Sequence, residues 1–179
     1  LSVGFALAER AAGAAERHIY DAPVLFKVKT PYQSIVVTRW RHDVRLMLDG
    51  HLQFSSVDEY RYHEALVHPA VSSLRGPPRR ALVIGGGDGM VLRELLRYSK
   101  LEAVTLVDLD PKMTELFRDD ALLSGLNDGA YRDPRVTVVN ADGMSWLEEC
   151  EDVFDVVIVD LPDPRNYSLS KLYTRGFYR

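Results

Sequence analysis

Short apolar runs alternate with amphipathic segments over the second half of this chain. Such runs are typical of strands buried on both faces, and they span residues 81–84, 103–110, 135–142 and 153–160. The segments between them place apolar residues at helical spacing, as at Met90, Val91, Leu95 and Leu96. Strands and helices that alternate at these lengths predict an α/β fold, a doubly wound parallel sheet of the Rossmann-like class.

The first half of the chain follows a different rhythm. Apolar and polar residues alternate with period two over 24–40 and 44–54, and Asp49-Gly50 is a hairpin signal between apolar flanks. This pattern predicts a small antiparallel β unit over residues 23–57. The Ala-rich residues 5–17 favour a helix, so we expect a linker helix within residues 1–22.

A capping box, Ser56 with Glu59, predicts a helix that begins near Asp58. Pro69 is expected to kink that helix or divide it in two. A run of proline, glycine and arginine at 75–80 then marks the start of the sheet region. We assign residues 58–179 to this α/β sheet domain.

Composition narrows the function classes. The chain has 179 residues, 46% of them hydrophobic, and a formal net charge of −4, so we expect no nucleic-acid partner. A single cysteine, Cys150, excludes an internal disulfide framework. The apolar stretch at residues 1–8 is too short to span a membrane, and no signal peptide is visible. Because the chain begins with Leu1, we expect it to be a piece of a longer protein.

Carboxylates follow the predicted strands, and glycines follow the first one. Strand ends in a parallel sheet meet at one rim where ligands bind. Gly85, Gly87 and Gly89 form a turn over residues 85–89, here called the glycine turn, in which a ligand can approach the backbone closely. Met90 departs from the dinucleotide pattern, which requires a small residue there. Asp108, about 20 residues on, is placed to bind ribose hydroxyls, so an adenosine-containing ligand without a pyrophosphate is favoured.

Asp88 lies among the glycines and bears on the charge of that ligand. Its carboxylate would repel the carboxylate of S-adenosylmethionine but would attract a decarboxylated tail that ends in an ammonium group. The alternative is that Asp88 only caps the helix that follows.

Several motifs in order resemble the spermidine synthases, the polyamine aminopropyltransferase family. They are "YQSIVV", "LDGHLQFSSVDEYRYHEAL", "VIGGGDGMVLREL", "VTLVDLD", "RVTVVNADG" and "FDVVIVDLPDP", within residues 31–164. The resemblance implies a methyltransferase-like Rossmann fold, in which residues 58–179 form a nucleoside-binding catalytic domain that lacks the last part of the family fold. It also implies transfer of an aminopropyl group from decarboxylated S-adenosylmethionine, as co-substrate, to a polyamine such as putrescine, without a prosthetic group.

The resemblance also implies roles for particular residues. The nucleoside co-substrate would be bound by Gln33, His63, Gly85, Gly87, Asp88, Asp108, Asp142 and Gly143. Tyr62, Asp88 and Asp163 would bind the amine, and Asp160 would be the catalytic residue. Asp160 suits that role chemically, because an alkyl ammonium must lose a proton before it can attack carbon. A simple Asp-Pro turn at 160–164 is the alternative for these acids.

The residues after Pro164 depart from the family pattern. Arg165 and Lys171 bring positive charge beside a polycation site, which leaves the acceptor amine open. This variant resembles a subgroup fused behind a membrane-embedded region, so the chain is expected to be a cytoplasmic domain. We expect a homodimer and no metal, since the histidines show no metal-ligand spacing. A methyltransferase and a non-catalytic nucleoside-binding domain are the competing functions.

Overall fold

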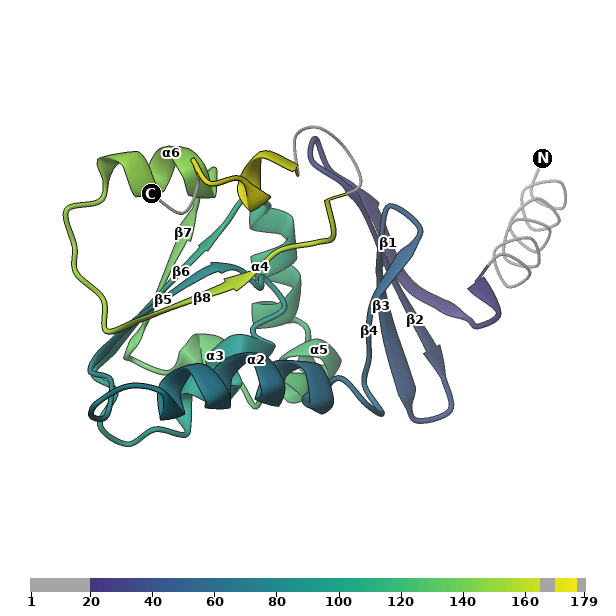
Figure 1. Cartoon of the computed structure of the whole chain (residues 1–179). Helices are drawn as coiled ribbons and strands as arrows, with labels where there is room; N and C mark the ends of the chain where they lie inside the picture. Colours follow the sequence, from purple (N-terminus) through teal and green to yellow (C-terminus); the bar gives the residue numbers. More distant parts are fainter. Residues whose placement is uncertain (1–19, 165–169, 177–179) are drawn as a thin grey trace, which may run out of the picture. The chain divides into compact units, whose positions relative to one another are not determined.

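The computed structural model describes residues 20–164 and 170–176 (Figure 1). The chain divides into two compact units, an N-terminal unit of residues 1–60 and a C-terminal unit of residues 61–179. This division lies three residues after the boundary expected between 57 and 58. The helix predicted at residues 5–17 lies outside the described residues. Within the described part, no helix is long and apolar enough to cross a membrane.

The N-terminal unit contains a four-stranded antiparallel meander. Its strands follow the order β1-β2-β3-β4 and span Val24–Lys29, Ser34–Trp40, Asp43–Leu48 and His51–Ser55. Asp49 and Gly50, with φ of 51° and 79°, form the predicted two-residue turn between β3 and β4. Apolar burial alternates along β1, as expected, whereas β2 buries Ile35, Val36, Val37 and Thr38 in succession.

The C-terminal unit is built on a parallel sheet with the order β7-β6-β5-β8. The strands span Arg80–Gly85 (β5), Ala103–Asp108 (β6), Val136–Asn140 (β7) and Val156–Asp160 (β8). The predicted α/β class with a parallel sheet is therefore confirmed. β5 pairs with β6 on one side and with β8 on the other. In this register Gly85 lies opposite Asp160, so the glycine turn and the end of β8 are neighbours.

Helices cover both faces of this sheet. They are α2 (Tyr60–Ser72), α3 (Met90–Leu96), α4 (Pro111–Asp119), α5 (Ala121–Leu126) and α6 (Gly143–Glu149), with short 3₁₀ turns η1 (Ala130–Arg132) and η2 (Lys171–Tyr173). α4 begins as predicted, with Pro111 in its first turn and the Asp110 side chain accepting from Lys112 N. α2 continues to Ser72 with Pro69 inside it, so Pro69 does not divide the helix, and the alternative of a kink stays a prediction. Pro69 lies in the last turn, where losing one backbone hydrogen bond does not end the helix.

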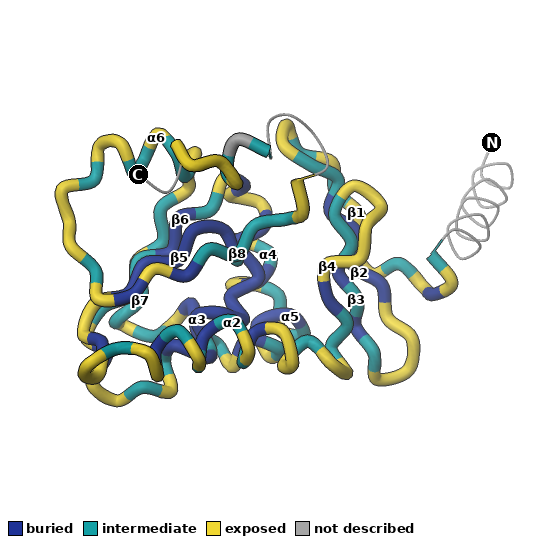
Figure 2. The backbone as a smooth tube through the Cα atoms, viewed as in Figure 1, coloured by how far each residue is buried: buried dark blue, intermediate teal, exposed yellow. Residues whose placement is uncertain are grey.

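The core lies between the sheet and its helices. On one face Leu82, Ile84 and Val107 are buried and pack against side chains that include Met144 and Trp146 of α6. The opposite side of the pleat carries Ala81 and Val83, also buried, and α3 contacts β5. Figure 1 shows α6 and α3 on opposite sides of the sheet, and Figure 2 shows β5 between its two neighbours, buried from Ala81 to Gly85.

A buried carboxylate joins α2 to α3. The Glu94 side chain is 1% exposed, and it accepts from Arg93 Nε at 2.9 Å and from Arg97 Nη1 at 2.7 Å. His68 of α2 places Nε2 3.2 Å from the same carboxylate, while its Nδ1 lies 2.8 Å from the Tyr98 hydroxyl. The surrounding cationic groups compensate the desolvation of Glu94.

Replacing Glu94 with alanine should destabilise the chain by about 2–3 kcal/mol, because it removes the buried carboxylate that Arg93, Arg97 and His68 share. Urea unfolding followed by circular dichroism measures this loss. Glu115→Ala is the matched control, since Glu115 makes one exposed pair with Lys112 at 3.2 Å, and it should change the free energy of unfolding by no more than about 0.5 kcal/mol. Equal effects of the two variants would contradict a structural role for Glu94.

Candidate active site

The glycine turn follows β5 without a side chain in the way of β8. Gly85, Gly86 and Gly89 have φ of 79°, 66° and 78°, the left-handed region that favours glycine. A Cβ on Gly85 would lie 2.1 Å from the backbone oxygen of Asp160. That oxygen accepts a hydrogen bond from Gly86 N at 3.0 Å. Glycine at this position therefore allows the end of β8 to lie directly against the turn.

Asp108, at the end of β6, is bound to the glycine turn. Its Oδ2 accepts from Gly87 N at 3.0 Å, and its Oδ1 accepts from Asp110 N at 2.9 Å. Burial raises the pKa of Asp108 to about 6, although the two backbone donors oppose that shift. The carboxylate is thus fixed beside the turn, where a nucleoside ribose is expected. Its ribose-binding role stays a prediction.

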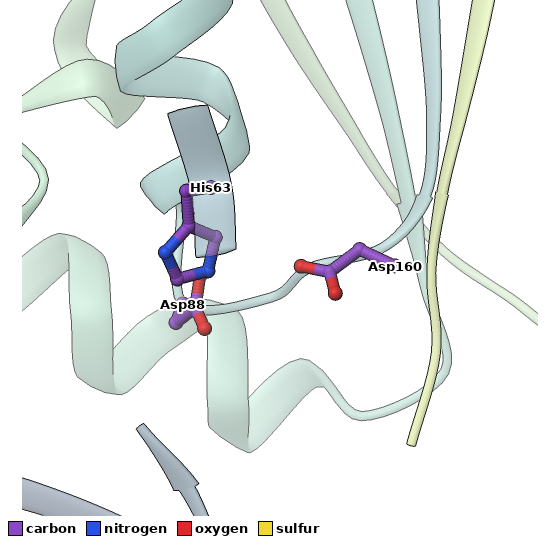
Figure 3. A group of neighbouring side chains, drawn as sticks. All are labelled: His63, Asp88 and Asp160. Atoms are coloured by element: carbon purple, nitrogen blue, oxygen red, sulfur yellow. The ribbon is translucent and has the colours of Figure 1, made fainter. Parts of the chain in front are cut away.

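Three of the predicted site residues gather at one place in the C-terminal unit. His63 of α2, Asp88 of the glycine turn and Asp160 of β8 offer ligand atoms within 4.8 Å of one another, as Figure 3 shows. His63 is 3% exposed and Asp88 is 8% exposed. Asp88 Oδ1 also accepts from Met90 N at 2.9 Å, at the start of α3. The carboxylate of Asp88 therefore both bonds the helix terminus and faces Asp160.

The surroundings of Asp160 shift its pKa. Burial raises its pKa to about 6, and the negative charge of Asp88 adds to the rise. His63 and a hydrogen bond from Tyr62 act in the opposite direction. Tyr62 Oη donates to Asp160 Oδ1 at 2.9 Å, and the pKa of Tyr62 is raised well above its usual range, chiefly by burial and then by Asp160. Two carboxyl groups this close form a site for a cation.

The remaining predicted residues come from other segments of the chain. Asp142 begins α6, where its Oδ1 accepts from Ser145 N at 2.9 Å, and Gly143 lies close enough to Ile84 that a Cβ would approach it to 2.9 Å. Asp163 is exposed in the segment after β8. Gln33 belongs to the N-terminal unit, where its backbone oxygen accepts from Thr30 N at 2.9 Å. Arg165 lies outside the described residues.

Sequence reasoning missed two buried polar side chains behind the glycine turn, Asn127 and Tyr131. Tyr131 Oη donates to the Gly87 oxygen at 2.7 Å, and Asn127 Nδ2 donates to the Asp88 oxygen at 3.0 Å. Both come from the irregular segment between α5 and β7, which has no periodicity to reveal a buried residue. The only signal in the sequence was the group of turn-forming polar residues within "GLNDGAY", which is typical of an ordered loop.

The arrangement suits a cation better than an anion. A separate cavity of about 450 Å³ in the same unit is lined by Arg93, Arg97, Arg132 and Arg135, by Asp128 and Asp133, and by none of the site carboxylates. Because its arginines outnumber its aspartates, this cavity favours an anion over a cation. The nitrogen of His63 with the oxygens of Asp88 and Asp160 is also a donor set that metal ions accept. The expectation that the protein uses no metal stays a prediction.

Comparison with known families identifies this unit. The profile of the spermine/spermidine synthase domain matches residues 59–179. The chain is 55% identical over its full length to polyamine aminopropyltransferase 2 of Ralstonia nicotianae and 48% identical over 99% of its length to polyamine aminopropyltransferase of Leptospira interrogans. It covers 35% and 36% of those proteins, so it spans about a third of the curated relatives it matches.

Solved structures agree with the sequence matches. A spermidine synthase in complex with the transition state analogue AdoDATO aligns with a TM-score of 0.79 at 31% identity. The alignment covers 87% of this chain and 52% of that one. The spermidine synthase of Thermotoga maritima aligns with a TM-score of 0.76, again at 31% identity over 87% of this chain and 51% of that one. The fold expected from the resemblance is confirmed.

The raised pKa of Asp160 predicts a pH-dependent stability. A carboxyl with a pKa near 3.8 when unfolded and about 6 when folded favours the folded state in its protonated form. Its contribution is complete below the unfolded pKa and is lost as the pH rises through about 6. Asp160→Asn should remove roughly 2–3 kcal/mol of the fall in stability between pH 4 and pH 7. Urea unfolding across this range measures the slope, with the exposed Asp163→Asn as control; an unchanged slope in Asp160→Asn would contradict the perturbed pKa.

Proposed function

The chain belongs to the spermine/spermidine synthase family, and we propose from this that it carries the catalytic site of a polyamine aminopropyltransferase. The reaction would move an aminopropyl group from decarboxylated S-adenosylmethionine to a polyamine acceptor such as putrescine. The observation that carries the proposal is the group formed by buried His63 of α2, buried Asp88 of the glycine turn and half-buried Asp160 at the end of β8. Its two carboxyl groups match a reaction whose substrates are both cations.

The nucleoside would lie along the glycine turn. Gly85 and Gly87 would contact the ligand, Asp108 would bind the ribose hydroxyls, and Asp142 with Gly143 would lie on the adenine side. The contact between Asp108 Oδ2 and Gly87 N supports this, because Asp108 is the proposed ribose acid. Gln33 is a further candidate for nucleoside binding.

The aminopropyl ammonium would be bound by Asp88, with His63 beside it. A group ending in ammonium gains attraction from Asp88, whereas an added carboxylate would be repelled. The acceptor amine would bind at Tyr62, Asp160 and Asp163. This division of roles keeps one acid for each cationic group that enters the site.

Asp160 would act as the general base. The acceptor ammonium gives a proton to Asp160, and the freed nitrogen lone pair attacks the carbon next to the sulfonium. The new C–N bond forms as the C–S bond breaks, and its electron pair leaves on sulfur as neutral methylthioadenosine. A pKa of about 6 makes Asp160 a stronger base than an ordinary aspartate while leaving it mostly ionised at pH 7. The Tyr62 hydroxyl orients the carboxylate that receives the proton.

In the proposed full-length enzyme, residues outside this chain would add to the acceptor site. Since the curated relatives are about three times as long, we propose that the complete enzyme supplies further acceptor contacts. We also propose that it forms a homodimer and works in the cytoplasm, with a membrane-embedded region in a longer parent chain. It would need neither a prosthetic group nor a metal.

Ligand preference tests the identity of the co-substrate. Calorimetry with the chain should show binding of decarboxylated S-adenosylmethionine and methylthioadenosine, and weaker binding of S-adenosylmethionine by about tenfold or more, because its carboxylate meets Asp88. Asp88→Asn should reduce that preference, while the exposed Asp128→Asn, on a loop after α5, should keep it. Preference for S-adenosylmethionine would overturn the proposal in favour of a methyltransferase. Absence of binding by all three would favour a non-catalytic domain.

Replacement of the proposed base separates binding from chemistry. Asp160→Asn in the full-length enzyme should lower the transfer rate by about 10²-fold or more, since the amine loses its proton acceptor. Methylthioadenosine affinity should change by less than about threefold, because the nucleoside contacts are elsewhere in the site. Product formation from decarboxylated S-adenosylmethionine and putrescine measures the rate. Asp163→Asn is the comparison for a charge lost without the base, and near-normal turnover by Asp160→Asn would exclude Asp160 as that base.

A further inference from the structure

The glycine turn is held from behind by two side chains that take no part in the proposed chemistry. Tyr131 belongs to η1, and Asn127 is the residue that ends α5. Both are buried, at 9% and 0% exposed. Neither was predicted from the sequence, and neither contacts His63 or Asp160 through any hydrogen bond that the described residues make. Their contacts are with the backbone that carries Asp88.

The peptide units on either side of Asp88 are fixed by these side chains. Tyr131 Oη donates to the Gly87 oxygen at 2.7 Å, while Gly87 N donates to Asp108 Oδ2 at 3.0 Å. Gly87 is therefore bonded on one side to the ribose acid and on the other to Tyr131. Asn127 Nδ2 then fixes the following carbonyl, that of Asp88, at 3.0 Å.

The geometry leaves Asn127 little freedom. Its Nδ2 donates to the Phe117 oxygen at 3.1 Å as well as to Asp88, so turning the amide over would lose both bonds. Its Oδ1 is buried and has no hydrogen-bond partner among the described residues. Burying an acceptor without a hydrogen-bond partner costs free energy. The structure accepts this cost at Asn127 Oδ1, while Nδ2 makes the two hydrogen bonds that link the turn to α4. The orientation of the Asn127 amide is therefore fixed by its two hydrogen bonds to the carbonyl groups of Asp88 and Phe117.

Glycine is required at position 89 by the same pair. A Cβ on Gly89 would lie 2.7 Å from Tyr131 Cε2 and 2.9 Å from Asn127 Nδ2. The turn is therefore packed against both side chains as well as bonded to them. Asp88 is left between two constrained neighbours, and its own Oδ1 is bonded to Met90 N.

We propose that Tyr131 and Asn127 are positioning residues: they hold the Gly87 and Asp88 carbonyl groups, and through them set the place of the Asp88 carboxylate opposite Asp160 and His63. The pair determines whether the turn receives an ammonium group. This last consequence rests on the proposed function, whereas the positioning itself does not. Burial of both side chains keeps water from replacing their hydrogen bonds.

Tyr131→Phe tests the inference with little change in packing, because the ring that covers Gly89 is kept. Tyr98→Phe is the control, since Tyr98 bonds His68 and does not touch the turn. In the labelled 179-residue chain, the carbonyl ¹³C resonance of Gly87 should shift in Tyr131→Phe and stay in place in Tyr98→Phe. An unchanged Gly87 resonance in Tyr131→Phe would overturn the inference.

The titration of Asp160 shows whether the hydrogen bond also positions Asp88. Asp88, His63 and Tyr62 all act on the carboxyl of Asp160, and Asp88 is the one attached to the turn. If Asp88 moves away, the midpoint of the Asp160 carboxyl ¹³C titration should fall by about half a pH unit in Tyr131→Phe and stay in place in Tyr98→Phe. A shifted Gly87 carbonyl with an unmoved midpoint would make Tyr131 merely structural and would overturn the positioning role.

Ligand binding separates this inference from the proposed function. Where wild-type chain binds decarboxylated S-adenosylmethionine, Tyr131→Phe should weaken it by about fivefold and affect methylthioadenosine, which lacks the ammonium, by less than twofold. Equal weakening of both ligands would contradict a role directed at Asp88. If wild type binds neither ligand, the proposed function fails, and the two resonance measurements still decide whether the pair positions Asp88.

Discussion

The close approach of β8 to the glycine turn is the constraint on which the site depends. Gly85 lies opposite Asp160 in the β5–β8 register, and only the absence of a side chain at Gly85 lets the Asp160 carbonyl come so near. The bond from Gly86 N to that carbonyl then fixes the last residue of β8. As a result the Asp160 carboxylate faces Asp88 across a single turn of chain. A wider turn would separate the two acids and weaken their shared attraction for a cation.

Burial of the site carboxyl groups has an energetic consequence for the protein. Burial raises the pKa of Asp108 and of Asp160 to about 6, so ionising each in the folded chain at pH 7 costs roughly 3 kcal/mol relative to water. The packing of the sheet and the hydrogen bonds to the glycine turn offset this cost. Sites that bind charged ligands often retain such unfavourable charges, because a bound cation relieves them.

The grouping of the site acids could be predicted from the sequence because it follows from the geometry of a parallel sheet. Parallel strands bring their carboxyl ends to one rim, so Asp88, Asp108 and Asp160 were expected together once the strands were recognised. The Asp49-Gly50 turn and the Pro111 helix start depended on local chemistry alone. The sequence could not place Gln33 relative to these acids, nor show that Pro69 would be tolerated near the end of α2. The hydrogen bond from Tyr62 to Asp160 joins residues 98 apart in the chain, which no local pattern specifies.

The roles of Asn127 and Tyr131 could not be predicted from the sequence. Residues that touch a ligand are constrained by its chemistry, and their types can be recognised from spacing and charge. Residues that hold a backbone carbonyl are constrained only by shape and by one donor group, which several side chains supply. The role of Tyr131 can be recognised only in the folded structure, where its hydroxyl lies 2.7 Å from Gly87 O and its ring packs against Gly89. The glycines and their supporting side chains therefore form one unit of the fold: the missing Cβ at Gly85 makes room for the end of β8, and the missing Cβ at Gly89 makes room for Tyr131 and Asn127.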